Sequence, residues 1–201
     1  MSVTVIVATY GDKDRWDRIS MRALLSAEGQ TRIPDDIIRA HGDTLHGARN
    51  AAAIAAKTEW LCFLDADDEL HPEYIEAMEC ADGDLRYPMM QTVVNGIDVD
   101  SPKDLANHDL IQGNFMVIGT FVRRNQFLRV GGFSNIPVYD DWELWLKCVL
   151  MGDSAKLVPA AIYRMHDVPG SRNKNIELST MYWPLIRSRY FDGTLMTSDY
   201  W

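Results

Sequence analysis

Cysteine is scarce in this chain, and the three that occur are far apart. Cys62, Cys80 and Cys148 are the only ones among 201 residues. Disulfide frameworks and zinc sites need cysteines in close, regular spacings, which these positions do not provide. We therefore expect three free thiols and a reducing, cytoplasmic location.

Positive charge is also in short supply. Lys and Arg number 20 against 29 Asp and Glu, which gives a formal net charge of -9. Binding to nucleic acid depends on clustered cations that neutralise phosphates, so the acidic balance argues against a nucleic-acid partner. An anionic small substrate would need a bound metal ion or a few well-placed basic side chains.

Long apolar runs are missing as well. No segment has the length of a membrane-spanning helix or the pattern of a signal peptide, so we expect no membrane span. With 47% hydrophobic and 24% charged residues, the composition is that of an ordinary globular protein. The length fits a single domain over residues 1–201, and no internal repeat is visible.

Strand and helix patterns alternate over the first 64 residues. Short apolar, β-branched runs at 3–9, 36–40 and 60–64 predict strands, and helical spacing at 16–27 and 47–57 predicts two helices. This alternation predicts an α/β fold with a mainly parallel, Rossmann-like central sheet flanked by helices. Right-handed crossovers would place the loops after Thr9 and Leu64 at one edge of that sheet.

The second half is more varied in pattern. Asn95-Gly96 is a strong turn signal after an extended segment, and polar loops are expected at 98–109 and 168–175. The remaining predicted elements are an extended segment over 85–94, a strand over 113–122, helices over 125–130 and 140–151, strands over 155–158 and 161–163 separated by Pro159, and a final helix over 176–190.

The stretch Trp60 to Leu70, WLCFLDADDEL, holds the strongest chemical signal. Asp65, Asp67 and Asp68 directly follow an apolar strand, and their mutual repulsion is costly unless a cation lies among them. Carboxylates of this kind suit Mg²⁺ or Mn²⁺ together with substrate phosphates. A solvated acidic turn is the simpler reading, but open α/β sheets bind ligands at the carboxyl ends of their strands, which favours a site.

Four segments, in this order, resemble family 2 of the inverting glycosyltransferases with the GT-A fold. They are VTVIVATY, ARNAAAIAAKTEWLCFLDADDEL, IGTFVRRNQFLRVGGF with YDDWELWLK, and YRMHDVPGS. The resemblance extends to about Ser171. It implies a nucleotide-sugar-binding half over 1–95, an acceptor and catalytic-base half over 96–175, and a C-terminal helix and tail over 176–201.

The resemblance also implies roles on the donor side of the site. The family often has an Asp pair and a Gly after its second strand, and one Asp reads the base. This chain has Arg39-Ala40-His41-Gly42-Asp43 instead, so either Asp43 or His41 takes that role or base recognition differs from that of the family. The other implied roles are Thr9 and Tyr10 beside the base, Arg49 on the base or phosphate, Asp65 on the ribose, Asp67 and His166 as metal ligands, and Asp68 in support. A histidine ligand would favour Mn²⁺ over Mg²⁺.

On the acceptor side the resemblance implies Asp141 as general base, with Asp140 where Glu is common. Acids are also favoured in the first turn of a helix by its dipole, which would lower their pKa. A carboxylate can still serve if it lies within hydrogen-bond reach of the acceptor hydroxyl. Trp142 and Trp145 could support a sugar ring, although core packing is the simpler role for that apolar stripe.

Taken together, the sequence and the resemblance imply a metal-dependent hexosyltransferase. Its donor would be a nucleotide-diphosphate sugar, most simply a UDP-sugar, and its acceptor a hydroxyl on a glycan, protein or small molecule. A nucleotidyltransferase is one alternative, although the first strand is not followed by a Gly-rich, Lys-bearing phosphate loop. A non-catalytic sugar-nucleotide or carbohydrate binding module of the same fold is the other, and it gains weight if Asp141 turns away from the cleft.

Overall fold

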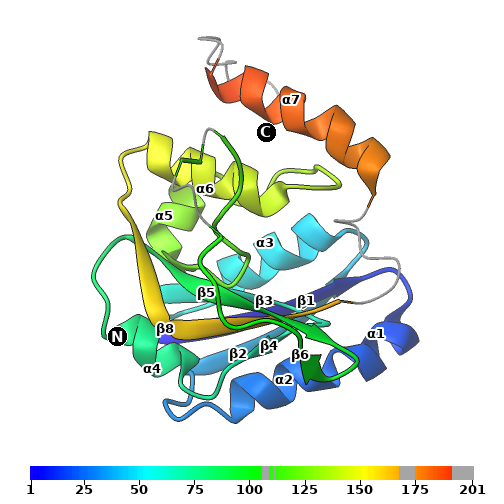
Figure 1. Cartoon of the computed structure of the whole chain (residues 1–201), viewed down its shortest axis with the longest axis vertical. Helices are drawn as coiled ribbons and strands as arrows, with labels where there is room; N and C mark the ends of the chain where they lie inside the picture. Colours follow the sequence, from blue (N-terminus) through cyan, green and yellow to red (C-terminus); the bar gives the residue numbers. More distant parts are fainter. Residues whose placement is uncertain (106–108, 111, 168–174, 192–201) are drawn as a thin grey trace.

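The computed structural model describes residues 1–105, 109–110, 112–167 and 175–191. An eight-stranded sheet forms its centre, with strand order β2-β1-β3-β7-β5-β8-β4 and β6 paired to β5 (Figure 1). The strands are β1 Val3–Tyr10, β2 Asp36–Gly42, β3 Trp60–Asp65, β4 Glu69–Leu70, β5 Leu85–Val94, β6 Ile97–Asp98, β7 Phe121–Arg123 and β8 Ala155–His166.

The sheet is mainly parallel, as predicted, but not purely so. Strand β1 pairs in parallel with β2 and β3, and β5 pairs in parallel with β8. The short strand β7 joins these two halves by antiparallel pairing to both β3 and β5. Strand β4 is antiparallel to β8, and β6 is antiparallel to β5. The first half is therefore built from βαβ units, whereas the second half also contributes antiparallel strands to the sheet.

Helices cover both faces of the sheet. In Figure 1, α3, α5 and α6 lie above it, α1, α2 and α4 lie below it, and α7 lies over α6. The predicted helix over 16–27 is two helices that meet at Ser20, whose near-helical backbone lets the apolar spacing continue. The helices are α1 Lys13–Ile19, α2 Met21–Glu28, α3 Leu45–Ala55, α4 Tyr74–Glu79, α5 Arg124–Arg129, α6 Asp140–Leu150 and α7 Ile176–Phe191.

Two predictions about the second half are wrong. The predicted strand over 113–122 is a loop up to Thr120, and only Phe121–Arg123 forms a strand. The predicted strand pair around Pro159 is the single strand β8, because a shift in its register with β5 accommodates the proline. The expected turn at Asn95-Gly96 is confirmed, with positive φ at both residues. Most of the expected loop over 168–175, and the tail, lie outside the described residues.

Large aromatic side chains fill the core on both faces of the sheet, and Phe121 packs against Trp60 and against Tyr74 of α4 on the face away from α6. Trp60, Phe63 and Phe121 come from the strands, and Trp142 and Trp145 come from α6; all five are at most 1% exposed. The two α6 tryptophans are therefore core residues, which confirms the simpler of the two roles considered for them. All three cysteines are free thiols, as expected, with Cys62 and Cys148 buried.

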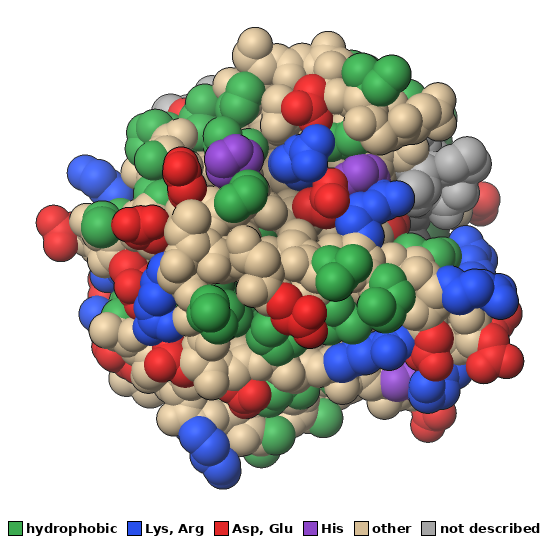
Figure 2. All heavy atoms as spheres, turned by 90° about the horizontal axis from the view of Figure 1, so that it is seen from below, with side chains coloured by type: hydrophobic (Ala, Val, Ile, Leu, Met, Phe, Trp, Pro, Cys, Tyr) green, Lys and Arg blue, Asp and Glu red, His purple; other side chains and the backbone are tan. Residues whose placement is uncertain are grey.

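The surface agrees with the mixed charge of the sequence. On the face seen from below in Figure 1, acidic and basic side chains are interspersed (Figure 2). Among the described helices, none combines the length and the apolar character that crossing a membrane would need.

Candidate active site

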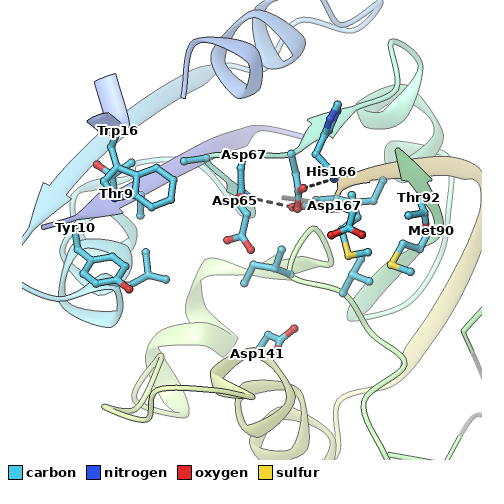
Figure 3. A pocket seen from close by; sticks show the side chains of 18 of the residues that line it. Thr9, Tyr10, Trp16, Asp65, Asp67, Met90, Thr92, Asp141, His166 and Asp167 are labelled. Carbon is cyan, nitrogen blue, oxygen red and sulfur yellow. Dashed lines mark hydrogen bonds between the residues drawn. The ribbon is translucent and has the colours of Figure 1, made fainter. Parts of the chain in front are cut away.

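A cavity of about 730 Å³ opens where β1 and β3 end. The loops after Thr9 and Leu64 both line it, as the predicted crossovers required. Tyr10 and Trp16 lie at one end, Met90 and Thr92 at the other, and Asp65 and Asp141 between them (Figure 3). Residues 114–118, from the loop before β7, form a further part of the wall.

The three aspartates predicted as a metal site form one cluster on this cavity. Asp65, Asp67 and Asp68 each offer a carboxylate oxygen, and these atoms lie within 4.8 Å of one another. Asp65 ends β3, and Asp67 and Asp68 follow in the turn before β4. Three carboxylates at such spacing repel one another, so a divalent cation held by oxygen ligands fits the donor set.

Asp68 is the most buried member of the cluster, at 6% exposure. Burial, followed by the charges of Asp65 and Asp67, raises the pKa of its carboxyl well above the ordinary value. Two hydrogen bonds oppose that rise: the Tyr163 hydroxyl donates to Oδ2 at 2.9 Å, and the backbone N–H of His166 donates to Oδ1 at 2.7 Å. The same Tyr163 oxygen accepts a bond from the Asp65 backbone N–H at 3.2 Å. Strand β8 thereby fixes the shape of the aspartate turn.

His166 lies beside this cluster, but its ring is engaged elsewhere. Its Nε2 lies 2.6 Å from Glu69 Oε2, and that carboxylate also accepts a bond from Arg164 at 3.0 Å. The ring is turned away from Asp65 and Asp141 (Figure 3). The structure thus brings three aspartates together and leaves the imidazole of His166 outside the group.

Arg49 is placed differently from the expectation of a donor contact. It is 3% exposed and does not line the cavity. Its guanidinium donates to Asp65 at 2.5 Å and also to Asp140, and lies over the Phe133 ring. Burial acts to lower the Arg49 pKa, but the neighbouring carboxylates outweigh it and raise that pKa. Arg49 therefore connects the end of β3 to the start of α6.

Asp141 lines the cavity, whereas Asp140 does not. Burial and the adjacent Asp140 charge raise the pKa of Asp141 to about 7. The expected lowering by the helix dipole is therefore wrong for this residue: the Trp142 N–H does donate to Asp141 at 2.8 Å, but desolvation outweighs that bond. A carboxyl that titrates near neutrality suits proton transfer at physiological pH.

The residues expected around the nucleotide base are only partly together. Thr9 and Tyr10 line the cavity, and Thr9 Oγ1 lies 3.0 Å from His41 Nδ1. Asp43 is exposed and lies outside the cavity lining. Of the two candidates for the base-reading position, His41 is therefore the one connected to the cavity wall.

Sequence reasoning missed several cavity residues. Asn114 donates a hydrogen bond to Asp141 at 3.0 Å, but it lies in the segment predicted as a strand. The pattern around Tyr163 predicts only a strand and gives no signal that its hydroxyl reaches the aspartates. Trp16 lines the cavity from α1, and its aromatic character so close to the turn after β1 was the one available signal.

Comparisons with known proteins bear on the family and on the fold. Residues 31–128 match the model described as glycosyl transferase family 2. Comparison with curated proteins gave no match. Among solved structures, residues 1–349 of TarS from S. aureus are similar in the complex with UDP-GlcNAc (TM-score 0.67, 15% identity, 94% of this chain, 71% of that chain) and in the complex with UDP (TM-score 0.64, 17% identity, 98% and 74%).

A longer TarS structure is also similar, with a TM-score of 0.63 and 16% identity over 95% of this chain, which spans 44% of that one. At these identities the structural likeness shows the fold, which is GT-A. With the match of residues 31–128 to the glycosyl transferase family 2 model, this fold supports a glycosyltransferase of that family. The nucleotidyltransferase alternative is thereby set aside.

Proposed function

We propose that this glycosyltransferase takes a sugar from a UDP-sugar, with a divalent metal ion, and transfers it to an acceptor hydroxyl with inversion. One observation carries the proposal: the aspartate cluster and Asp141 face the same cavity from opposite sides (Figure 3). An inverting displacement needs this arrangement, because the leaving group and the base act on opposite faces of the anomeric carbon.

The donor would lie along the ends of β1 and β3. Tyr10 and Trp16 offer aromatic faces for the base at one end of the cavity, and Thr9 with His41 offers polar contacts beside them. The resemblance implies that Asp65 binds the ribose hydroxyls. Support for uridine comes from the similar TarS structures, whose bound molecules are UDP-GlcNAc and UDP.

Asp67, supported by Asp68, would hold the metal ion, which we propose to be Mn²⁺ or Mg²⁺. When bound, such an ion neutralises the diphosphate as it leaves and acts as a Lewis acid. His166 remains a proposed second ligand, and its ring would have to exchange Glu69 for the ion. Its participation would favour Mn²⁺.

Asp141 is the proposed general base. As the acceptor oxygen bonds to the anomeric carbon and the bond to the diphosphate oxygen breaks, Asp141 accepts the hydroxyl proton. A single displacement inverts the anomeric centre. Asp140 would act indirectly, because its carboxylate pairs with Arg49 away from the cavity. That Asp141 lines the cavity favours this enzyme over a non-catalytic binding module of the same fold.

Donor binding tests the metal role directly. Asp67→Ala should abolish Mn²⁺-dependent binding of UDP, because the cluster loses a ligand while Asp65 and Asp68 remain. Isothermal titration of UDP with Mn²⁺, repeated with a chelator, measures this. Asp98→Ala, an acidic residue outside the cavity, is the matched control. Equal affinity of wild type and Asp67→Ala in the presence of Mn²⁺ would contradict the metal site.

A further inference from the structure

Asn114 makes a directed contact with the proposed base. Its Nδ2 donates to Asp141 Oδ2 at 3.0 Å. The orientation of the amide is set by its other end, because Oδ1 accepts a bond from the Met116 backbone N–H at 3.1 Å. An amide flip would place two acceptors face to face at Asp141 and two donors at Met116, so the network fixes the donor side toward the carboxylate.

The loop that carries Asn114 is held by the helix that carries Asp141. Two buried tryptophans of α6 donate from their indole nitrogens to backbone carbonyls of this loop. Trp142 donates to Leu110 at 2.8 Å, and Trp145 donates to Met116 at 2.9 Å. Because both side chains are fully buried, the spacing between loop and helix is set by core packing. The two tryptophans therefore fix the position of Asn114 relative to Asp141.

We propose that Asn114 is a positioning residue for the base: its amide holds the Asp141 carboxylate in the orientation that faces the cavity. The proposal rests on the role of Asp141 given above. With the Trp142 N–H on Oδ1 and the Asn114 amide on Oδ2, both carboxylate oxygens have a donor. Rotation of the side chain would break both bonds, so the proton acceptor stays directed at the acceptor hydroxyl.

The same amide also favours the ionised form of Asp141, because it donates to a carboxylate. Other groups act on this carboxyl as well: Asp140 and Asp65 raise its pKa, whereas Arg49 and the Trp142 N–H lower it. Loss of one donor to a charged group corresponds to a shift of about one pH unit. Asn114→Ala should therefore raise the Asp141 pKa by roughly that amount.

The first test needs no substrate. Carbon-13 NMR of the aspartate carboxyls, with Asp141→Asn to assign the resonance, gives the Asp141 titration directly. The wild-type midpoint near pH 7 should move upward in Asn114→Ala, and further in Asn114→Asp, which removes the donor and adds a negative charge. Asn125→Ala, on the exposed surface of α5, should leave it unchanged. An unmoved midpoint in both folded Asn114 variants overturns the proposal.

The second test follows UDP release from UDP-GlcNAc with Mn²⁺, water serving as the acceptor. Asn114→Ala should lower kcat about tenfold with little change in KM, and should shift the acidic limb of the pH profile upward. Asn114→Ala in an Asp141→Asn background should add no further loss. A raised KM with unchanged kcat would instead make Asn114 a donor contact and overturn its positioning role.

The two proposals fail in different ways. Wild-type rates of UDP release in Asp141→Asn would remove Asp141 as base, and with it the proposed mechanism. An unmoved carboxyl titration in the Asn114 variants would remove only the role of Asn114, and would leave Asp141 as the base.

Discussion

At the scale of single residues, Arg49 is the side chain whose environment differs most from what its sequence context suggests. A cation on a small-residue helix reads as a solvated residue or a phosphate contact. In the structure it is buried, stacks on Phe133 and pairs with Asp65 and Asp140. Burying a charge is tolerated only when its partners are charged and close, and here two carboxylates meet that condition.

The main effect of replacing Arg49 should therefore be a lower free energy of unfolding. Arg49→Met leaves the buried Asp140 carboxylate without its cation, which should lower the free energy of unfolding by about 3–5 kcal/mol. Urea denaturation measures the loss. The double variant Arg49→Met, Asp140→Leu removes both charges and should recover a large part of it. If the double variant is no more stable than the single one, loss of the ion pair is not the cause of the destabilisation.

Asp141 carries a second residue-scale prediction, on pH. Its folded pKa of about 7 lies above the unfolded value of about 3.9. Between these values the unfolded chain has released a proton that the folded chain retains, so stability falls as pH rises toward 7 and stays low above it. Asp141→Asn removes this penalty and should raise the melting temperature more at pH 8 than at pH 5.

Thermal unfolding at pH 5 and at pH 8 tests the predicted direction of this pH dependence. Asp100 is the matched control, because the Lys103 ammonium and the Thr92 N–H lower its pKa. Asp100→Asn should lose the same stability at pH 5 and at pH 8, because a carboxyl with a lowered pKa is ionised in both the folded and the unfolded chain at these values. A pH-independent effect of Asp141→Asn would show that the carboxyl titrates at its ordinary value.

At the scale of elements, the loop before β7 meets β8 at one glycine. A Cβ on Gly119 would lie 2.4 Å from the Tyr163 ring and 2.6 Å from the Tyr74 hydroxyl. Tyr163 in turn bonds to Asp65 and Asp68, so the glycine allows the close approach that holds the aspartate turn. Two elements far apart in the chain share this contact, and no local sequence pattern signals it.

Gly119→Ala should displace Tyr163 and damage the aspartate cluster. We expect a destabilisation of about 1–3 kcal/mol from overpacking, together with weaker Mn²⁺-dependent UDP binding because Asp68 loses a donor. Chemical denaturation and calorimetric titration measure the two effects. Gly42→Ala is the control for stability alone, since its nearest contact of 3.4 Å is an ordinary one. Unchanged stability and UDP affinity in Gly119→Ala would exclude this coupling.

At the scale of the whole molecule, the final helix packs on the helix that carries the proposed base. The Trp183 ring lies 5.0 Å from that of Trp142 and also contacts Tyr139. Glu143 on α6 is fully buried and accepts bonds from Arg189 at 2.7 Å and Tyr190 at 3.0 Å. Helix α7 therefore supplies partners that α6 requires.

Truncation after Asn175 should destabilise the protein by about 3–5 kcal/mol, because the Glu143 carboxylate loses its bonds from Arg189 and Tyr190 and the α6 tryptophans lose their contacts with α7. For a chain of this size that corresponds to a fall of roughly 10 °C in melting temperature. Truncation after Phe191, which keeps α7 whole, is the control. Equal melting temperatures for the two truncations would mean that α7 contributes nothing to the stability of α6.

The sequence by itself determined the alternation of strands and helices in the first half and the acidic turn at the end of β3. These features depend on local patterns: apolar runs, helical spacing and charges adjacent in the chain. It also carried the family resemblance, because the four motifs stand in order along the chain. The division into halves at 1–95 and 96–175 stays a prediction.

Only the tertiary structure decided which charged groups face one another. Arg49 and Asp140 are 91 residues apart, Tyr163 and Asp68 are 95 apart, and Asn114 and Asp141 are 27 apart. The pKa of Asp141 likewise depends on desolvation in the folded chain and on the charge of Asp140, which together outweigh the hydrogen bond from the Trp142 N–H. Such contacts arise from the folding of distant segments onto one another, so short-range patterns in the chain do not specify them.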